Sequence, residues 1–431
     1  MRKLLLAASL AVLASVSPGH AAKIALAPFY QNLAAISPDQ PLGTVVAKEP
    51  VATEVPGAEA WRIAYVSSDV RGKKTLSTGL VVVPKGAPPA GGRPIVAWAH
   101  GTTGTAQYCG PSQVLDPVQE LNEYFLVGGT SWTDFGIPAV THFIEKGYAV
   151  VATDYQGLGG GGDHQYGVAN SNAHDAINSV RALGSMGLAG DGKKALIYGW
   201  SQGGGTTIAA ASLKDYISET GTAYDGVSFV GFVALAPDDL ASMITPDATT
   251  DEGALKFMQG FASTFSDNVF NFAHFSMYTW GMVSAYPELK LTDLFTEDGA
   301  KALDEIYSKK CMHPGSDTIN FTFGASYKSL VKPQPENTSA WTKALIDSSV
   351  QKVAPIAPVL IYFGTADTVV PPVMGEIYQK QMCGMGGNVT RVQLEGAQNH
   401  FTTPPTAEPL YIPWVDDRLA GKPLDNGCPA N

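Results

Sequence analysis

Residues 195–213 read ALIYGWSQGGGTTIAAASL and contain the motif Gly199-Trp200-Ser201-Gln202-Gly203. The apolar run 195–200 predicts a buried strand, and the small residues of 202–213 predict a helix. A G-x-S-x-G pattern between a strand and a helix is typical of a strained turn that lifts a serine hydroxyl clear of a sheet. A glycine-rich loop beside a buried helix is the alternative, but it would not require the preceding strand. Ser201 is therefore the predicted nucleophile.

Strand-like and helix-like segments alternate on both sides of this motif. Apolar patterns predict strands at 60–67, 76–83, 94–100, 148–154, 195–200, 227–235, 358–363 and 389–394. Apolar spacing and helix-ending glycines predict helices at 139–146, 172–186, 202–213, 372–381 and 407–419. Repeated strand–helix units favour an α/β fold with a mainly parallel central sheet and helices on both faces.

The alternation stops between residues 237 and 353. Helical segments there are dense in aromatic residues: Phe257, Phe261, Phe265, Phe270, Phe272, Phe275, Tyr278 and Trp280. Such an interruption predicts a helical cap inserted into the core, and an aromatic cap above a nucleophile favours apolar substrates. We expect a signal peptide at 1–22, the first part of the core at 23–236, the cap at 237–353 and the second part of the core at 354–431.

A serine hydroxyl needs a general base to act as a nucleophile. Where a serine occupies this type of turn, the chain order is serine, then acid, then histidine. His274 and His313 lie inside the predicted cap, and only His400 follows it, in the polar loop GAQNH at 396–400. A solvated loop histidine is the alternative. His400 is the predicted base.

The acid should follow the carboxyl end of a strand. Asp367 meets this condition, because it lies just beyond the strand 358–363 in a loop that leads through Val-Pro into a helix. Its carboxylate could accept a hydrogen bond from the imidazole and stabilise the imidazolium. Asp238 and Asp239, which follow the strand ending at Leu235, are the competing candidates. We favour Asp367.

Two segments are predicted to hold a developing oxyanion. The loop His100-Gly101-Thr102-Thr103-Gly104 follows a buried strand, and Thr102 or Thr103 could supply a donor there. The second donor is the backbone N–H of Gln202, at the start of the helix after the nucleophile. An ordinary glycine turn is the alternative for the first loop.

Charge and motif spacing exclude several classes of protein. The net charge is −11 and no basic cluster is longer than a pair, which argues against a nucleic-acid partner. The glycine-rich stretch 157–162 opens no helix and precedes no lysine, so it is not a nucleotide loop. His164 beside Asp163 lacks further ligands and is interpreted as structural. We expect no metal and no cofactor.

The N-terminus has the pattern of a signal peptide. Arg2 and Lys3 precede the apolar run 4–16, and small residues place a cleavage site near Ala22 or Lys23. We therefore expect a secreted or periplasmic protein. The four cysteines, Cys109, Cys311, Cys383 and Cys428, then suggest two disulfides with three connectivities, free thiols being the alternative. We favour Cys383–Cys428, which leaves Cys109 and Cys311.

Taken together, these motifs resemble the secretory lipase family of the α/β-hydrolase superfamily, known in fungi and bacteria. The resemblance spans most of the mature chain and rests on His100–Gly104, Cys109-Gly110-Pro111-Ser112, Gly147-Tyr148, Asp154, Gly157, Gly199–Gly203, Cys311, Gly364–Asp367 and Asn399-His400. It implies an α/β-hydrolase fold with a helical cap, a Ser201–Asp367–His400 triad, hydrolysis of carboxylic esters including acylglycerols, and a Cys109–Cys311 bridge. Some members carry an acidic residue where this chain has Thr102-Thr103.

The sequence thus predicts a secreted serine esterase or lipase that acts through an acyl-enzyme on Ser201. We expect a monomer whose partners are small-molecule or lipid ester substrates, with transient contact to a lipid interface. A serine exopeptidase on the same fold is the alternative, although the aromatic cap shows no obvious charged residue to capture a peptide end. A catalytically silent binding protein is a third class, which would lack the serine or the histidine.

Overall fold

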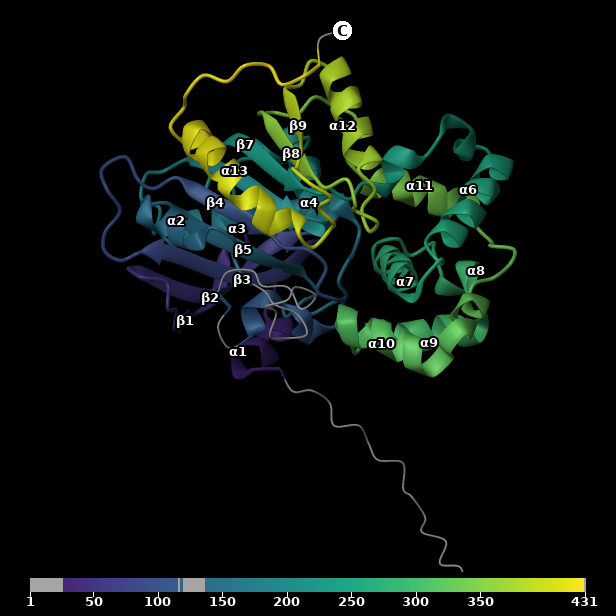
Figure 1. Ribbon diagram of the computed structural model, residues 1–431. Helices are drawn as coiled ribbons and strands as arrows, with labels where there is room; N and C mark the ends of the chain where they lie inside the picture. Colours follow the sequence, from purple (N-terminus) through teal and green to yellow (C-terminus); the bar gives the residue numbers. More distant parts are fainter. Residues whose placement is uncertain (1–25, 115–116, 119–135, 430–431) are drawn as a thin grey trace, which may run out of the picture.

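A computed structural model describes residues 26–114, 117–118 and 136–429, so the predicted signal peptide lies outside the described residues. A nine-stranded sheet crosses the described part of the chain in the order β1-β2-β3-β5-β4-β6-β7-β8-β9 (Figure 1). The strands are β1 (Val45–Val51), β2 (Ala58–Ser68), β3 (Lys74–Pro84), β4 (Ile95–Ala99), β5 (Ala149–Gln156), β6 (Lys194–Trp200), β7 (Ser228–Leu235), β8 (Val359–Phe363) and β9 (Val389–Gln393).

The sheet is mostly parallel. From β5 to β9 all neighbouring strands pair in parallel, whereas β1, β2, β3 and β5 pair with one another antiparallel. Because parallel strands end at the same edge of a sheet, the loops that follow β4, β6, β7, β8 and β9 meet there. This is the fold class that the alternating sequence pattern predicts.

Helices cover both faces of this sheet. They are α1 (Pro28–Gln31), α2 (Val140–Glu145), α3 (Ala169–Ser185), α4 (Gln202–Ala210), α5 (Lys214–Ile217), α12 (Val373–Gly384) and α13 (Thr403–Leu419). The central strand β4 shows the two layers, because Ile95, Ala97 and Ala99 pack in the hydrophobic cluster of α3 and α4, and Val96 and Trp98 pack in that of α2 and α13. Strands buried on both faces read as continuous apolar runs, as these do.

Edge strand β1 and the start of α13 are two of the places where the structure differs from the sequence expectation. The edge strand β1 (Val45–Val51) is not predicted, because Lys48, Glu49 and Pro50 interrupt its apolar pattern. Charged residues and proline are common in edge strands, where they block further pairing. Helix α13 begins at Thr403, four residues before the predicted start, with Pro404 in its first turn, where a missing N–H costs nothing.

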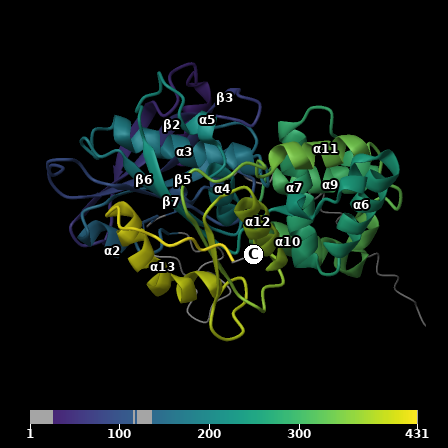
Figure 2. The same cartoon turned by 90° about the horizontal axis from the view of Figure 1, so that it is seen from above.

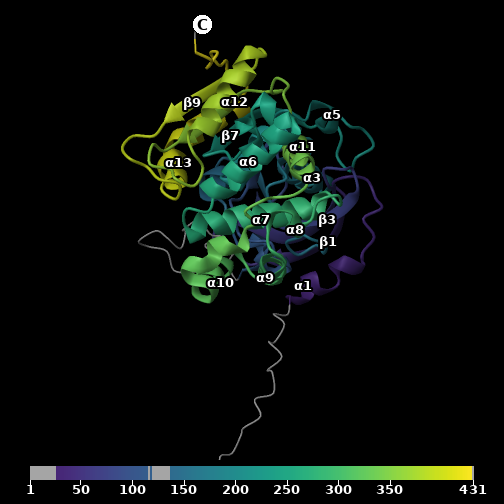
Figure 3. The same cartoon turned by 90° about the vertical axis from the view of Figure 1, so that its right-hand side faces the viewer.

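Between β7 and β8 the chain leaves the sheet and forms a separate group of helices. They are α6 (Asp251–Thr264), α7 (Val269–Ala285), α8 (Leu291–Leu294), α9 (Glu297–Tyr307), α10 (Met312–Phe323) and α11 (Thr338–Ser348). Figures 1 and 2 show them gathered at one side of the sheet, and Figure 3 shows them in front of it. They share a hydrophobic cluster rich in Phe, Tyr, Trp and Met. We call residues 237–353 the cap segment.

Two disulfides tie distant parts of the chain together. Cys109, after β4, is joined to Cys311, at the start of α10, across 202 residues of sequence. Cys383, in α12, is joined to Cys428 near the C-terminus. This is the pairing favoured from the sequence, in which Cys383 pairs with Cys428 and Cys109 and Cys311 remain for the other bridge.

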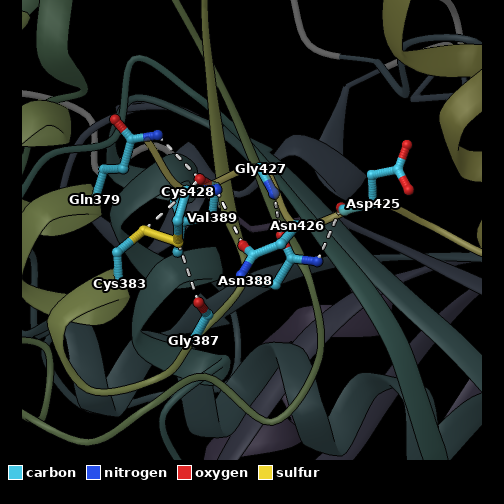
Figure 4. Close-up of a disulfide and its surroundings, with 9 residues drawn as sticks. All are labelled: Gln379, Cys383, Gly387, Asn388, Val389, Asp425, Asn426, Gly427 and Cys428. Carbon is cyan, nitrogen blue, oxygen red and sulfur yellow. Dashed lines mark hydrogen bonds between the residues drawn. A yellow bond between two sulfur atoms is a disulfide. The ribbon is translucent and has the colours of Figure 1, made fainter. Parts of the chain in front are cut away.

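The second disulfide fastens the C-terminal tail to α12, close to the start of β9 (Figure 4). Beside it, the Asn388 side chain donates to the Asp425 carbonyl at 3.2 Å and accepts from the Gly427 N–H at 2.8 Å. Cys383 precedes β9, so the bridge lies toward the amino end of that strand, whereas the loops after β4 and β6 to β9 lie at the carboxyl ends.

In the described part of the chain, no helix combines the length and hydropathy needed to cross a bilayer.

We predict that replacing Cys383 and Cys428 together by serine lowers the free energy of unfolding by about 2–4 kcal/mol, because the bridge closes a loop of 45 residues in the unfolded chain. Urea unfolding followed by circular dichroism measures the change. An unchanged unfolding midpoint in the double variant would contradict a stabilising role for this bridge.

Candidate active site

The turn at Ser201 has the strained backbone that its motif predicts. Ser201 adopts φ 58° and ψ −118° between the end of β6 and the start of α4. The turn needs glycines for steric reasons: a Cβ on Gly199 would lie 2.3 Å from the Gly203 carbonyl oxygen, and one on Gly203 would lie 1.8 Å from the Ala99 carbonyl oxygen. Such contacts are far inside van der Waals distance, so the glycines let β4, β6 and α4 meet around the serine.

Three side chains from separate loops form a hydrogen-bonded chain at this turn. His400 Nε2 lies 2.8 Å from Ser201 Oγ, and His400 Nδ1 lies 2.8 Å from Asp367 Oδ2. Because a carboxylate can only accept, the Nδ1–H donates to Asp367, which leaves Nε2 free to accept the serine proton. All three residues are buried, with 6% or less of their surface exposed. The structure thus brings together the nucleophile, acid and base that the sequence predicts.

Further hydrogen bonds fix the orientation of the residues in this hydrogen-bonded chain. Asp367 Oδ1 accepts the backbone N–H groups of Val369 and Val370, both at 2.9 Å, so the carboxylate cannot rotate freely. The Trp200 indole donates to the His400 carbonyl at 3.1 Å, and its ring lies 5.0 Å from the imidazole. The serine hydroxyl, imidazole and carboxylate are therefore oriented before any substrate arrives.

The competing acids lie elsewhere. Neither Asp238 nor Asp239 hydrogen-bonds to His400 within the described residues. The Asp239 carboxylate accepts the hydroxyl of Ser349, at the end of the cap segment. Asp238 follows β7 and reaches a cavity beside Ser201. Only Asp367 contacts the histidine, in agreement with the preference drawn from its loop.

The predicted oxyanion donors lie on two sides of the turn. Gln202 begins α4, so its N–H is one of the helix's unpaired amino-terminal groups. Thr102 Oγ1 lies 2.8 Å from the Tyr166 hydroxyl, and Thr103 Oγ1 is buried without a hydrogen-bond partner among the described residues. The Thr103 carbonyl accepts the N–H of Met312, next to Cys311. The first loop is thereby fastened to the cap segment.

Sequence reasoning missed how the Gln202 side chain is anchored. Its Nε2 donates to His164 Nε2 and to Asn172 Oδ1, both at 3.1 Å. His164 can accept because its other ring nitrogen donates to the Gln156 carbonyl at 2.7 Å, and burial lowers the pKa of its imidazole to about 3. His164 is structural, as expected, but the part it supports is the start of α4. No spacing in the sequence links it to Gln202.

Ser201 opens onto a small cavity between the sheet edge and the cap segment. The cavity measures about 40 Å³. Its wall comprises Ser201 and residues of the loops after β7 and β8, of α6 and α7, and of the loop before α3: Tyr166, Asp238, Leu240, Phe261, Phe265, Asn271, His274, Phe275, Tyr278, Val369 and Val370. Such a space holds a few water molecules but no acyl chain, because a ligand site usually needs at least ~300 Å³. The space beside the serine is therefore too small for an acyl chain in this conformation.

Metal-binding chemistry finds no support around this site. Among the residues that the structure describes, no three His, Cys, Asp or Glu side chains lie together as a metal would require. The polar groups at the site are instead a hydroxyl, imidazoles and single carboxyls, which suit proton transfer.

Comparison with known sequences places the chain in a family. The profile of the family described as "Secretory lipase" matches residues 128–234 and 262–427, more than half of the chain. Lipase 5 of Candida albicans is 22% identical over 86% of this chain and 74% of its own length. A secreted triacylglycerol lipase of Malassezia globosa is 24% identical, over 86% of this chain and 75% of its own length.

Solved structures agree on the fold. Candida antarctica lipase A superposes with a TM-score of 0.68 and 16% identity, covering 93% of this chain and 87% of its own. The rice cell wall degrading esterase LipA from Xanthomonas oryzae superposes with a TM-score of 0.63 and 19% identity, covering 89% of this chain and 100% of its own. The strained serine turn, the sheet order and the family profile agree, and the chain belongs to the secretory lipase family, a family of carboxylic ester hydrolases with the α/β-hydrolase fold.

Proposed function

We propose that this protein hydrolyses uncharged carboxylic esters through a Ser201–His400–Asp367 triad. The observation that carries the proposal is the unbroken chain of two 2.8 Å contacts from Ser201 Oγ through the imidazole to Asp367. Membership of the secretory lipase family supports the reaction class. Acylglycerols or similar apolar esters are the proposed substrates, because Phe, Leu and Val side chains form much of the cavity wall.

In the first half of the reaction, Ser201 Oγ attacks the ester carbonyl carbon while His400 Nε2 takes the hydroxyl proton. Asp367 stabilises the resulting imidazolium through the Nδ1–H bond. The negative charge that develops on the carbonyl oxygen is held by the Gln202 N–H and a donor from the Thr102–Thr103 loop. The imidazolium then returns the proton to the leaving alcohol, and the acyl group stays on Ser201.

In the second half, a water molecule gives its proton to His400 and attacks the acyl carbon. Collapse of the second oxyanion breaks the bond to Ser201 Oγ, which recovers its proton from the imidazolium. The acid product leaves and the free serine is restored. The described residues therefore supply every proton transfer that hydrolysis needs.

Substrate access depends on the cap segment, which we propose is a single unit of residues 237–353 above the serine. The 40 Å³ cavity is too small for an acyl chain, so side chains of α6 and α7 must move apart when an ester binds.

Two disulfides and the secreted triacylglycerol lipase among the relatives support export after removal of residues 1–22. We propose that the protein works outside the cytoplasm as a monomer.

We predict that Ser201→Ala abolishes labelling by a fluorophosphonate probe and lowers the rate of p-nitrophenyl butyrate hydrolysis by about 10³-fold or more, because no other residue replaces the nucleophile. Gel fluorescence and a spectrophotometric assay measure the two effects. Ser212→Ala is a matched control, since the Ser212 hydroxyl is buried without a partner in the described structure. Labelling that persists in Ser201→Ala would place the nucleophile elsewhere.

We predict that Asp367→Asn lowers kcat by about 10³- to 10⁴-fold, because an amide in place of the carboxylate disfavours the required imidazole tautomer and imidazolium. Asp239→Asn serves as control and should retain activity, since its partner is Ser349 rather than His400. Steady-state kinetics with thermal melting separates loss of chemistry from loss of folding. An inactive, folded Asp239→Asn beside an active Asp367→Asn would reverse the assignment of the acid.

We predict that replacing Cys109 and Cys311 together by serine lowers kcat/KM by about 10-fold, because the bridge fastens the chain just after the Thr102–Thr103 loop to the cap segment, beside the hydrogen bond from the Met312 N–H to the Thr103 carbonyl. The Cys383→Ser, Cys428→Ser double variant is the control. This control variant loses a disulfide near the amino end of β9, whereas Ser201 lies at the carboxyl ends of the strands. It should keep kcat/KM at 25 °C. Equal activity losses in the two double variants would show a general effect of destabilisation.

A further inference from the structure

The cavity beside Ser201 contains an unexpected polar group for a site that accepts apolar esters. Asp238 lines this cavity and is partly accessible from it, and its carboxyl group makes no hydrogen bond to any described residue. Its neighbour Asp239 differs, because it points away and accepts a hydroxyl from Ser349. Because the carboxyl group is partly accessible from the cavity, a ligand that binds there can supply the hydrogen-bond donor that the described residues do not.

The position of Asp238 relative to the nucleophile is fixed by the backbone. The Asp238 N–H donates to the Ser201 carbonyl at 3.3 Å, and the Ser201 N–H donates to the Leu235 carbonyl at 2.9 Å. The start of the loop after β7, at Leu235, and Asp238 three residues later are thus both hydrogen-bonded to the Ser201 backbone. A group that contacts the Asp238 side chain therefore lies close to the bond under attack.

A second acceptor faces the same cavity from the cap segment. His274 in α7 donates its Nδ1–H to the Phe270 carbonyl at 3.0 Å, which leaves Nε2 as an acceptor without a partner among the described residues. Burial, aided by His400 and His313, lowers the pKa of His274 to about 4, so the ring is neutral at pH 7. Tyr166, which could donate, already pairs with Thr102.

Two unpaired acceptors in the wall of one cavity call for a ligand that brings its own donors. We propose that Asp238 and His274 select esters carrying a hydroxyl group near the scissile bond, on either the acyl or the alcohol side. This deepens the proposed ester hydrolysis and rests on it. The neighbouring Phe261, Phe265 and Phe275 then contact the hydrocarbon part of the same substrate.

A hydroxyl group fits these acceptors better than an ammonium group does. Burial, with the Asp239 carboxylate second, raises the pKa of Asp238 to about 7, so its carboxyl group is partly neutral at pH 7. A carboxyl group in either state offers an oxygen that accepts from a hydroxyl, whereas a buried cation would require the carboxyl group to be ionised. A neutral His274 does not supply the missing charge.

The test compares four matched esters: ethyl butyrate, ethyl 3-hydroxybutyrate, 2-hydroxyethyl butyrate and ethyl 3-aminobutyrate. The second and third place the hydroxyl on the acyl and alcohol sides, and the fourth carries an ammonium group. We expect the wild-type kcat/KM for one hydroxylated ester to exceed that for ethyl butyrate by about 10-fold or more. Fluorophosphonate titration of Ser201 normalises each preparation to folded, active sites.

Variants assign the preference to its residues. Asp238→Leu should bring the ratio of hydroxylated to plain ester close to 1, whereas Asp238→Asn, which keeps one acceptor oxygen, should give an intermediate ratio. His274→Phe should also lower the ratio. Asp239→Asn, one position along and outside the cavity wall, is the matched control and should keep the wild-type ratio.

Several outcomes would overturn the assignment. A wild-type ratio near 1, a preference that survives Asp238→Leu, or a preference for ethyl 3-aminobutyrate would each exclude a hydroxyl site at Asp238. These results leave ester hydrolysis itself intact, because ethyl butyrate is still cleaved. Absence of both fluorophosphonate labelling and hydrolysis of all four esters would instead refute the proposed function.

Discussion

Close packing of three backbones around Ser201 is the constraint on which the rest of the site depends. Gly199 and Gly203 allow β4, β6 and α4 to approach more closely than any side chain would permit. The turn forces Ser201 to a positive φ, and the surrounding sheet holds it there through the N–H bond to Leu235. Backbone strain of this kind persists only where neighbouring structure over-determines it. The same turn sets the direction of α4 and the position of the Gln202 N–H.

The parallel part of the sheet converts this local turn into a site. Strands β4, β6, β7, β8 and β9 end at one edge, so loops far apart in sequence bring His400 and Asp367 into one hydrogen-bonded chain with Ser201 and place Asp238 in the cavity beside it. The strands fix where each loop starts, and local contacts fix each side chain, as the two N–H groups do for Asp367. The Cys109–Cys311 bridge then fastens the cap segment to this edge.

Exclusion of water gives the polar groups of the site their character. Burial keeps His164 and His274 neutral, which makes each an acceptor at one defined nitrogen. In the proposed reaction, the charge that develops on the imidazole and the oxyanion lies beside an apolar wall, where it is poorly screened and fixed dipoles count for more. Under this proposal the reaction depends on residues at the sheet edge, whereas the choice of ester depends largely on residues of the cap segment.

The sequence by itself determined the α/β fold and the serine turn, and the order of the histidines along the chain predicted His400 as the base. These features follow from local spacing, since apolar periodicity and glycines near a turn report backbone geometry directly. Only the tertiary structure decided that Asp367 rather than Asp238 contacts the imidazole, that His164 and Asn172 anchor Gln202, and that the cysteines pair as they do. Such partners lie tens to hundreds of residues apart, and no local pattern encodes which side chains the sheet edge brings together. The edge strand β1 was missed because its charges and proline hide the apolar pattern, although its pairing with β2 is evident in three dimensions.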